Sequence, residues 1–367
     1  MRVTKEMLGI QTRKSILYLD QHFFSSVYKG KDPRWGTAMQ RITELLDLQL
    51  VAVPYSSTHE AETDLYIEHR DDLLNFIQKV SRGHHLEPYY RIEQTQILKA
   101  FQAFLANAPS TYIRDESDAM PSSVHDWDGD YSISVFRAAS GVDRKREFKR
   151  QAVEELVKTL TIWAESKNTF EQDMALELGD SARILMEGYA KKTARLWSGD
   201  FSALIDSPIG ASVVEAMMYV LSVKEMHRDA FRILPAFFGS RHFAEVPSQQ
   251  LSARLFSTFK ERVRKDKRMH SNSEKAREKL SGFLFDVQHA ATYVPYCNSF
   301  FTDRFMADLL NDKHVGAEKT FGCKVFSVSS MAEFFIWLED VKSRMTADHA
   351  DGLTWAYRQY RSMGRGN

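Results

Sequence analysis

The sequence has little of what marks secreted, zinc-stabilised or membrane-spanning proteins. Cysteine occurs only at Cys297 and Cys323 among 367 residues, which is too few for a disulfide framework or a cysteine-based zinc cluster and fits a reducing cytoplasm. The N-terminal segment 1–14 contains no apolar run typical of a signal peptide. The most apolar later stretch, residues 213–223, is about half the length that spans a bilayer and contains Glu215. These absences predict a soluble, cytoplasmic protein that does not associate with membranes.

The chain also lacks an excess of charge of either sign. Its 49 basic residues equal its 49 acidic residues, so no overall field attracts nucleic acid, and any such binding must come from local patches. The apolar fraction of 43% is that of an ordinary globular protein. A chain of 367 residues is long enough for a large core, and its length predicts two structural regions.

Strand and helix patterns alternate near both ends of the chain. Segments with helical spacing of apolar residues, such as 58–80, follow short apolar runs. The runs typical of buried strands lie at 15–20, 51–57, 299–303 and 323–329. This alternation is characteristic of a parallel sheet covered by helices. We therefore expect an α/β, three-layer fold whose parallel central sheet is built from both ends of the chain.

The middle of the chain has helical character alone. Its four long helical segments are 153–166, 172–197, 210–234 and 249–268. We therefore expect residues 1–82 and 283–367 to form the two parts of the α/β domain, and residues 83–282 to form a large all-helical insertion.

Four acids fall where a parallel sheet places its ligands. Asp20 and Asp303 close the first and third predicted strands, and Glu62 lies in the first turns of the helix after the second. Asp286 lies on the helix just before the third strand. The carboxyl ends of parallel strands meet at one edge, so we expect the four to converge. Converging carboxylates repel one another unless they are protonated or neutralised, and Mg²⁺ or Mn²⁺ prefers such oxygen ligands.

Each of these residues also has a structural interpretation. Asp20 and Asp303 follow strands directly, where aspartate commonly caps the next helix. Ser57 and Glu60 have the spacing of a capping box, which favours Glu62 over Glu60 as the metal-site acid, and Glu93 is a third candidate for that role. The sequence leaves the identity of the second acid open.

Three stretches together resemble the successive acidic motifs of PIN-like nucleases. They are YLDQHFF at 18–24, PYSSTHEAET at 54–63 and DVQHAATYVPYCNSFFTD at 286–303. The resemblance covers about the first 80 and the last 85 residues. It implies a PIN-like fold interrupted by the helical insertion. It also implies a metal-dependent endonuclease, most often acting on RNA, in which Asp20, Glu62, Asp286 and Asp303 hold the metal and act in catalysis. Toxins and RNA-processing enzymes are typical roles in that family.

Substrate contacts are expected from two histidines and a basic run. His59 and His289 share helix faces with Glu62 and Asp286, so they are candidates for orienting the acids or contacting phosphate. The run 260–279 carries nine basic against four acidic residues and precedes the Asp286 helix. Its candidate contacts are Arg262, Arg264, Lys265, Lys267 and Arg268. The alternative is that this run, and a second one at 143–150, are solvated helix faces.

The sequence thus predicts an Mg²⁺- or Mn²⁺-dependent nuclease, with RNA favoured over DNA and a toxin or defence effector as one role. A first alternative is a catalytically silent member that binds nucleic acid or protein through its helical region. A second is a small-molecule phosphohydrolase, which commonly carries Asp-x-Asp after the first strand, whereas this chain has His22 at the second position. A regulatory protein and a second copy of the chain are further candidate partners.

Overall fold

The structure is a computed structural model of the chain. It describes the backbone of all residues except 1–4, 6–8, 64–68, 128–141, 207–209, 267–279, 281 and 364–367, and side chains outside these ranges except at 142–153, 206 and 357–363. Among the described residues, no helix combines the length and the apolar character needed to cross a membrane.

A four-stranded parallel sheet lies at the centre of the α/β part, with the strand order β2-β1-β3-β4. The strands are β1 (Ser15–Leu19), β2 (Val51–Ala52), β3 (Ser299–Phe301) and β4 (Lys324–Phe326). In the middle of the sheet, Leu17 pairs with Ser299 and Tyr18 with Phe300. The two ends of the chain therefore share one sheet, which confirms the predicted α/β class and the parallel arrangement.

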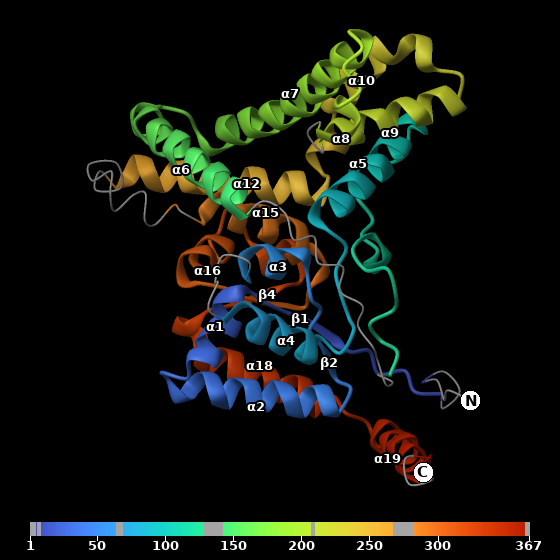
Figure 1. Ribbon diagram of the computed structural model, residues 1–367, viewed down its shortest axis with the longest axis vertical. Coiled ribbons are helices and arrows are strands. Elements are labelled where there is room, and N and C mark those ends of the chain that lie inside the picture. Colours follow the sequence, from blue (N-terminus) through green and yellow to red (C-terminus); the bar gives the residue numbers. More distant parts are fainter. Residues whose placement is uncertain are drawn as a thin grey trace.

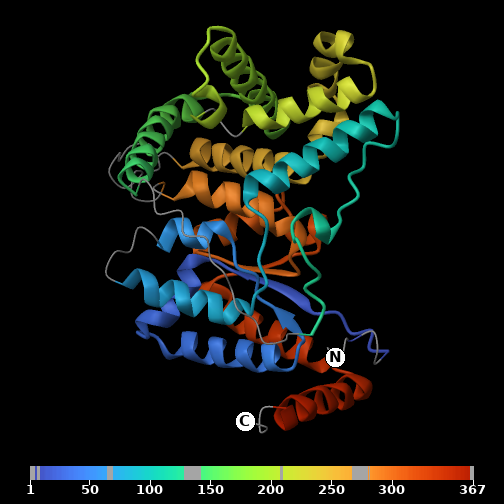
Figure 2. The ribbon, with the colours of Figure 1, turned by 45° about the vertical axis from the view of Figure 1, so that its right-hand side comes forward.

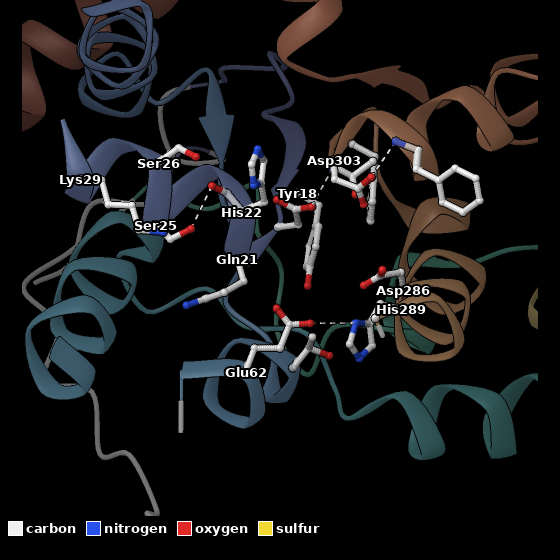
Figure 3. Close-up of a pocket in the computed structure, with 16 residues that line it drawn as sticks. Tyr18, Gln21, His22, Ser25, Ser26, Lys29, Glu62, Asp286, His289 and Asp303 are labelled. Carbon is white, nitrogen blue, oxygen red and sulfur yellow. Dashed lines mark hydrogen bonds and ion pairs between the residues drawn. The ribbon is translucent and has the colours of Figure 1, made fainter. Parts of the chain in front are cut away.

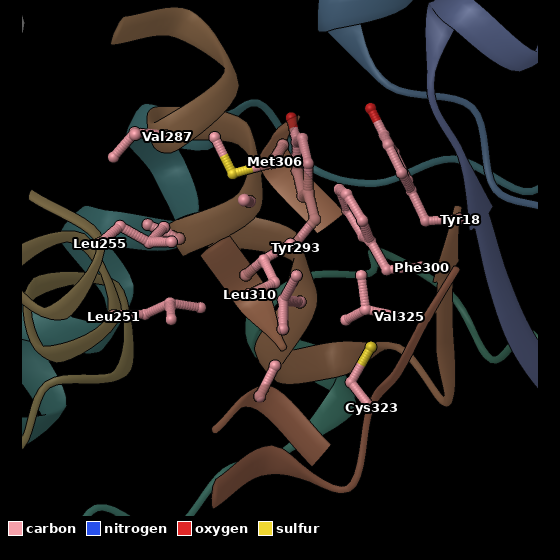
Figure 4. Packing of buried hydrophobic residues seen from close by; sticks show 14 of the residues in the cluster. Tyr18, Leu251, Leu255, Val287, Tyr293, Phe300, Met306, Leu310, Cys323 and Val325 are labelled. Atoms are coloured by element: carbon pink, nitrogen blue, oxygen red, sulfur yellow. The ribbon is translucent and has the colours of Figure 1, made fainter. Parts of the chain in front are cut away.

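Both faces of the sheet are buried. Successive strand side chains point to opposite faces, so Ile16 and Tyr18 join one apolar cluster while Leu17 and Leu19 join the other. On the first face the rings of Tyr18 and Phe300 stack with their centroids 4.8 Å apart (Figure 4). Double-sided burial explains why these strands are continuous apolar runs rather than alternating ones.

Helices cover the two faces as separate layers (Figure 1). The face of Leu17 and Leu19 packs against α1 (Gln21–Lys29), α2 (Pro33–Asp47), α4 (Arg70–Ser81) and α18 (Met331–Ser343). The opposite face packs against α15 (Phe283–Tyr293), α16 (Arg304–Leu310) and α17 (Ala317–Phe321). Two further helices are α3 (Ser57–Thr63), which follows β2, and α19 (Ala347–Met363).

The described helices within residues 83–282 stack beyond α15, on the side away from the sheet (Figure 2). They are α5 (Tyr89–Leu105), α6 (Val142–Glu165), α7 (Phe170–Trp197), α8 (Ala203–Asp206), α9 (Gly210–Val223), α10 (Ala230–Phe238), α11 (Arg241–Ala244) and α12 (Pro247–Lys265). Leu251 and Leu255 of α12 share a core cluster with Val287 of α15 (Figure 4). The described part of 83–282 contains no strand, in agreement with an all-helical region.

Two predicted helices differ in the structure. The segment 210–234 is not one helix, because Glu225 takes the left-handed conformation with φ 58° and separates α9 from α10. The segment 58–80 forms α3 and α4, with residues between them that lie outside the described part. Periodicity detects the apolar face of a helix but not a single residue that ends it.

Candidate metal centre

A pocket of about 530 Å³ lies where β1 and β3 end (Figure 3). Its lining includes all four predicted acids, Asp20, Glu62, Asp286 and Asp303, together with His289. These residues come from the ends of β1 and β3 and from α3 and α15. The fold thus brings together acids from both ends of the chain, as the carboxyl edge of a parallel sheet does.

Asp20 joins the end of β1 to the end of β3. Its Oδ1 accepts a hydrogen bond from the backbone N–H of Phe23 at 3.0 Å, which caps α1. Its Oδ2 accepts the backbone N–H of Asp303 at 3.1 Å, and the Thr302 side chain also bonds it. Asp20 therefore both caps α1, as the structural interpretation of the sequence expects, and lines the pocket.

Asp303 has the same double position on the neighbouring strand. Its Oδ1 accepts hydrogen bonds from the backbone N–H groups of Phe305 at 2.6 Å and Met306 at 3.2 Å, which caps α16. Capping fixes the carboxylate at the N-terminus of α16, where the helix dipole favours negative charge. The two aspartates that follow β1 and β3 are thus held at the pocket by the helices that they cap.

The ionisation of Asp20 is sensitive to what occupies the pocket. Its pKa is raised to about 6, mainly by burial and in smaller part by the nearby Asp303 carboxylate, while His22, Thr302 and the Phe23 N–H oppose the shift. A cation in the pocket would favour the charged carboxylate and so lower this pKa.

Glu62, Asp286 and His289 form the tightest group of metal-ligating side chains. One ligand atom from each lies within 4.8 Å of the other two, and His289 Nδ1 is 3.7 Å from Glu62 Oε1. Figure 3 shows Glu62 on α3 facing Asp286 and His289 on α15 across the pocket. Asp286 and His289 are three residues apart on a helix, so they project from the same face.

Gly282 makes room for the Asp286 carboxylate. A Cβ at position 282 would lie 2.9 Å from Asp286 Oδ2, closer than side-chain carbons approach. The Asp286 backbone N–H also donates to the Gly282 carbonyl at 2.9 Å, which fixes the first turn of α15. Glycine, at an ordinary φ of −106°, therefore leaves the Asp286 carboxylate its present position, which a larger residue would displace.

His59 lies beneath the described pocket lining, where it connects α3 to the end of β1. The side chain is fully buried, its Nδ1 accepts the Ser56 N–H at 3.1 Å, and its Nε2 lies 2.8 Å from the Leu19 carbonyl. These partners place the proton on Nε2, and burial lowers the pKa to about 4, so the ring is neutral. The structure thus corrects the substrate-contact prediction for His59, because the imidazole instead ties α3 to the end of β1.

The three glutamates that are candidates for the second acid differ in their position relative to the pocket. Glu62 lines the pocket, whereas Glu60 and Glu93 are absent from its described lining. The expected capping box is wrong in register, because α3 begins at Ser57 itself and His59 bonds back to Ser56. Glu93 lies on α5, where it accepts a hydrogen bond from Gln249 Nε2 at 2.6 Å.

The three predicted basic contacts that the structure describes lie outside the pocket. Arg262 pairs with Asp312 at 3.1 Å, Arg264 with Asp173 at 2.7 Å, and Lys265 with Glu261. None of these three cations is among the described residues that line the pocket, because α12 directs them toward acids of its neighbours and of its own last turn. Lys267 and Arg268 lie outside the described residues, as do the side chains of 143–150.

One polar wall of the pocket was missed by the sequence reasoning. Helix α1 contributes His22, Ser25, Ser26 and Lys29 to the lining (Figure 3). The spacing of these residues is i, i+3, i+4, i+7, so they form one face of the helix. A search of α1 for a polar stripe, rather than for basic runs, would have found them.

Comparison of the chain with protein-family models, with curated proteins and with solved structures found no match in any of the three.

Proposed function

We propose that the protein is a divalent-metal-dependent nuclease that hydrolyses phosphodiester bonds, with RNA as the favoured substrate. The observation that supports this function is the convergence of four carboxylates and an imidazole in one pocket at the carboxyl edge of the sheet. Carboxylate oxygens are the ligands that Mg²⁺ and Mn²⁺ prefer. The preference for RNA rests on the resemblance of the three acidic stretches to PIN-like nucleases.

Glu62, Asp286 and His289 are the residues best placed to hold a cation. Octahedral bonds of 2.0–2.1 Å separate neighbouring ligand atoms by about 3 Å and opposite ones by about 4 Å. The three ligand atoms already lie within 4.8 Å of one another, so small side-chain rotations would bring them to the spacing that one cation requires. An imidazole nitrogen among the donors favours Mn²⁺ over Mg²⁺.

Asp20 and Asp303 are proposed to complete the acidic lining from the ends of the neighbouring strands β1 and β3. A bound divalent cation would supply activation of water and neutralisation of charge on the phosphate. The polar face of α1 would receive the phosphate oxygens, since His22, Ser25, Ser26 and Lys29 offer hydrogen-bond donors in the same pocket. The chain would therefore bind the substrate backbone on α1 and the metal between α3 and α15.

One observation favours the catalytically silent alternative. The backbone hydrogen bonds of Asp20 and Asp303 cap α1 and α16, so both acids have a structural role without any metal. A silent protein would retain these caps while its Glu62, Asp286 and His289 failed to bind a cation tightly.

The test is cleavage of end-labelled single-stranded RNA and DNA with Mn²⁺, Mg²⁺ or EDTA. Wild type is compared with Asp20→Asn and Asp286→Asn, because asparagine preserves the capping ability and shape of aspartate. Asp312→Asn, which lies outside the pocket lining, is the matched control. We expect metal-dependent cleavage that falls at least about 100-fold in both pocket variants and not in the control.

Two further substrates separate the alternatives. Hydrolysis of p-nitrophenyl phosphate without cleavage of either nucleic acid would favour the small-molecule phosphohydrolase. Oligonucleotide binding without cleavage would favour the silent protein, and cleavage that survives both substitutions would place catalysis at other acids.

A further inference from the structure

We propose that a second cavity, between the inserted helices and α15, binds an organic cation with an apolar body. The cavity has a volume of about 700 Å³, within the size range of small-molecule sites. Residues of α5, α7, α9, α12 and α15 form its walls. Figure 1 shows these helices gathered on the side of α15 that faces away from the sheet.

The charge of the cavity lining has one sign. Glu93, Glu177 and Asp180 line it, and no lysine, arginine or histidine is found among the described lining residues. Such a cavity favours a positively charged ligand and repels an anion. A phosphorylated substrate is therefore excluded from this cavity, in contrast to the pocket with the metal-ligating residues.

Glu93 differs from the other two carboxylates of the cavity because its charge is not balanced by an ion pair among the described residues. Glu177 pairs with Lys260, and Asp180 pairs with Arg183 at 3.1 Å. Within the described part of the chain, Glu93 makes no such ion pair, and its recorded partner is the Gln249 amide. Burial raises its pKa, which reflects the cost of an uncompensated charge.

The position of Glu93 is fixed, and a second polar group accompanies it. Ser181 Oγ donates to Gln249 Oε1 at 2.5 Å, and Gln249 Nε2 donates to Glu93, so a chain of hydrogen bonds orients the carboxylate. Ser248 is only 5% exposed and lines the same cavity, yet among the described atoms its Oγ has no hydrogen-bond partner. An ammonium group beside Glu93 would form a charge-assisted hydrogen bond with its carboxylate.

The remaining lining suits an aromatic or aliphatic body. The apolar residues of the lining include Leu185, Val213, Phe256, Phe285, Val287 and Ala291. Tyr89 and Tyr90 add aromatic rings, which attract cations through their π faces. Together with the carboxylate, these groups define an arylalkylamine as the chemical class of the ligand.

The proposal is tested by isothermal titration calorimetry and thermal shift with three probes of similar shape. They are the cation 2-phenylethylamine, the neutral 2-phenylethanol and the anion 3-phenylpropionate. We expect the amine to bind, the alcohol to bind at least about tenfold more weakly, and the acid to show no binding, since a charge-assisted hydrogen bond contributes about a factor of ten or more. Equal affinity for amine and alcohol, or no binding of the amine, would overturn the proposal.

Three variants locate the binding. Glu93→Gln keeps the shape and the contact with Gln249, and we expect it to weaken amine binding at least about tenfold. Glu171→Gln removes the same charge from an exposed position on α7 outside the cavity and should have no effect. Ser252→Phe fills the cavity without altering a carboxylate and should abolish binding.

Amine binding that persists in Ser252→Phe would show that the amine binds elsewhere and would overturn the proposal even if Glu93→Gln failed to fold. Asp286→Asn should leave amine binding unchanged, because Asp286 faces the other pocket. The outcome is therefore independent of whether the protein cleaves nucleic acid.

Discussion

The acids of the pocket combine two roles at the scale of single residues. Asp20 and Asp303 cap helices through one oxygen, and Asp20 also bonds the neighbouring strand through the other. A carboxylate that caps a helix has few accessible rotamers, so it would be a preorganised ligand for a metal ion. Glu62, Asp286 and His289 lie on helix faces instead, and their positions depend on side-chain space around them.

Gly282→Ala is expected to weaken Mn²⁺ binding about tenfold. The added methyl group would lie 2.9 Å from Asp286 Oδ2, so the carboxylate must shift from its present position near Glu62 and His289. Isothermal titration calorimetry measures the affinity. Gly36→Ala on α2 is the matched control, because a Cβ there meets no atom within 4 Å. Unchanged Mn²⁺ affinity in Gly282→Ala would show that metal binding does not depend on this position of the Asp286 carboxylate.

His59 makes the stability depend on pH between about 4 and 6.5. Its pKa is lowered to about 4 in the fold from an unfolded value of 6.5, so the unfolded chain binds a proton that the folded chain excludes. Its contribution is fully present above the unfolded pKa and is lost as the pH falls toward 4. Between pH 7 and 5 we expect the free energy of unfolding to fall by about 2 kcal/mol more in wild type than in His59→Gln.

Urea denaturation at several pH values measures this difference. Parallel pH profiles for the two proteins would mean that His59 is not held neutral by its burial and by its contacts with Ser56 and Leu19.

Among the elements, α1 connects the sheet to the polar wall of the pocket. Its cap, Asp20, closes β1, while its buried side contributes Phe23 and Phe24 to the core. The face with His22 and Lys29 lines the pocket. Seven residues along a helix span about 10 Å, which exceeds one phosphate group, so this face suits a polynucleotide better than a small phosphate ester.

Lys29→Ala is expected to weaken binding of a single-stranded RNA several-fold and to reduce the slope of log K against log salt by about 0.7, the value for one phosphate contact. Fluorescence anisotropy in Ca²⁺, without turnover, measures both. Lys31→Ala removes an exposed charge two residues away, outside the described pocket lining, and should change neither quantity appreciably. Equal effects of the two substitutions would indicate only a general electrostatic attraction.

At the scale of the whole molecule, the pocket depends on contacts between distant parts of the chain. Asp20 and Glu62 precede the inserted helices, while Asp286 and Asp303 follow them. The backbone hydrogen bond from Asp303 to Asp20 joins positions separated by 283 residues. A ligand held by both groups therefore stabilises the entire α/β part rather than one local segment.

Mn²⁺ at about 100 times its dissociation constant is expected to raise the free energy of unfolding by about 2.7 kcal/mol. The increase should disappear in Asp286→Asn and on addition of EDTA. Urea denaturation with and without the metal measures it. An equal increase in wild type and Asp286→Asn would show that Mn²⁺ binds the folded chain outside the pocket.

The sequence reasoning located much of the fold because strands and helices have local signals. The apolar runs that became β1 and β3 end at Asp20 and Asp303, and parallel strands bring such ends to one edge. The break at Glu225 had no comparable signal, since glutamate rarely takes the left-handed conformation found there. The register of α3 was misjudged because His59 bonds to Leu19 of another element.

By itself the sequence determined the parallel α/β character, the helical middle region and the four acids that line the pocket. Three-dimensional packing was needed to show that Glu62 rather than Glu60 faces Asp286, and that His59 is fully buried while His289 lines the pocket. It also placed Arg262 and Arg264 against acids away from the pocket and the polar face of α1 within it. Periodicity reports whether a side chain is buried, whereas its partner is set by the packing of segments far apart in the chain.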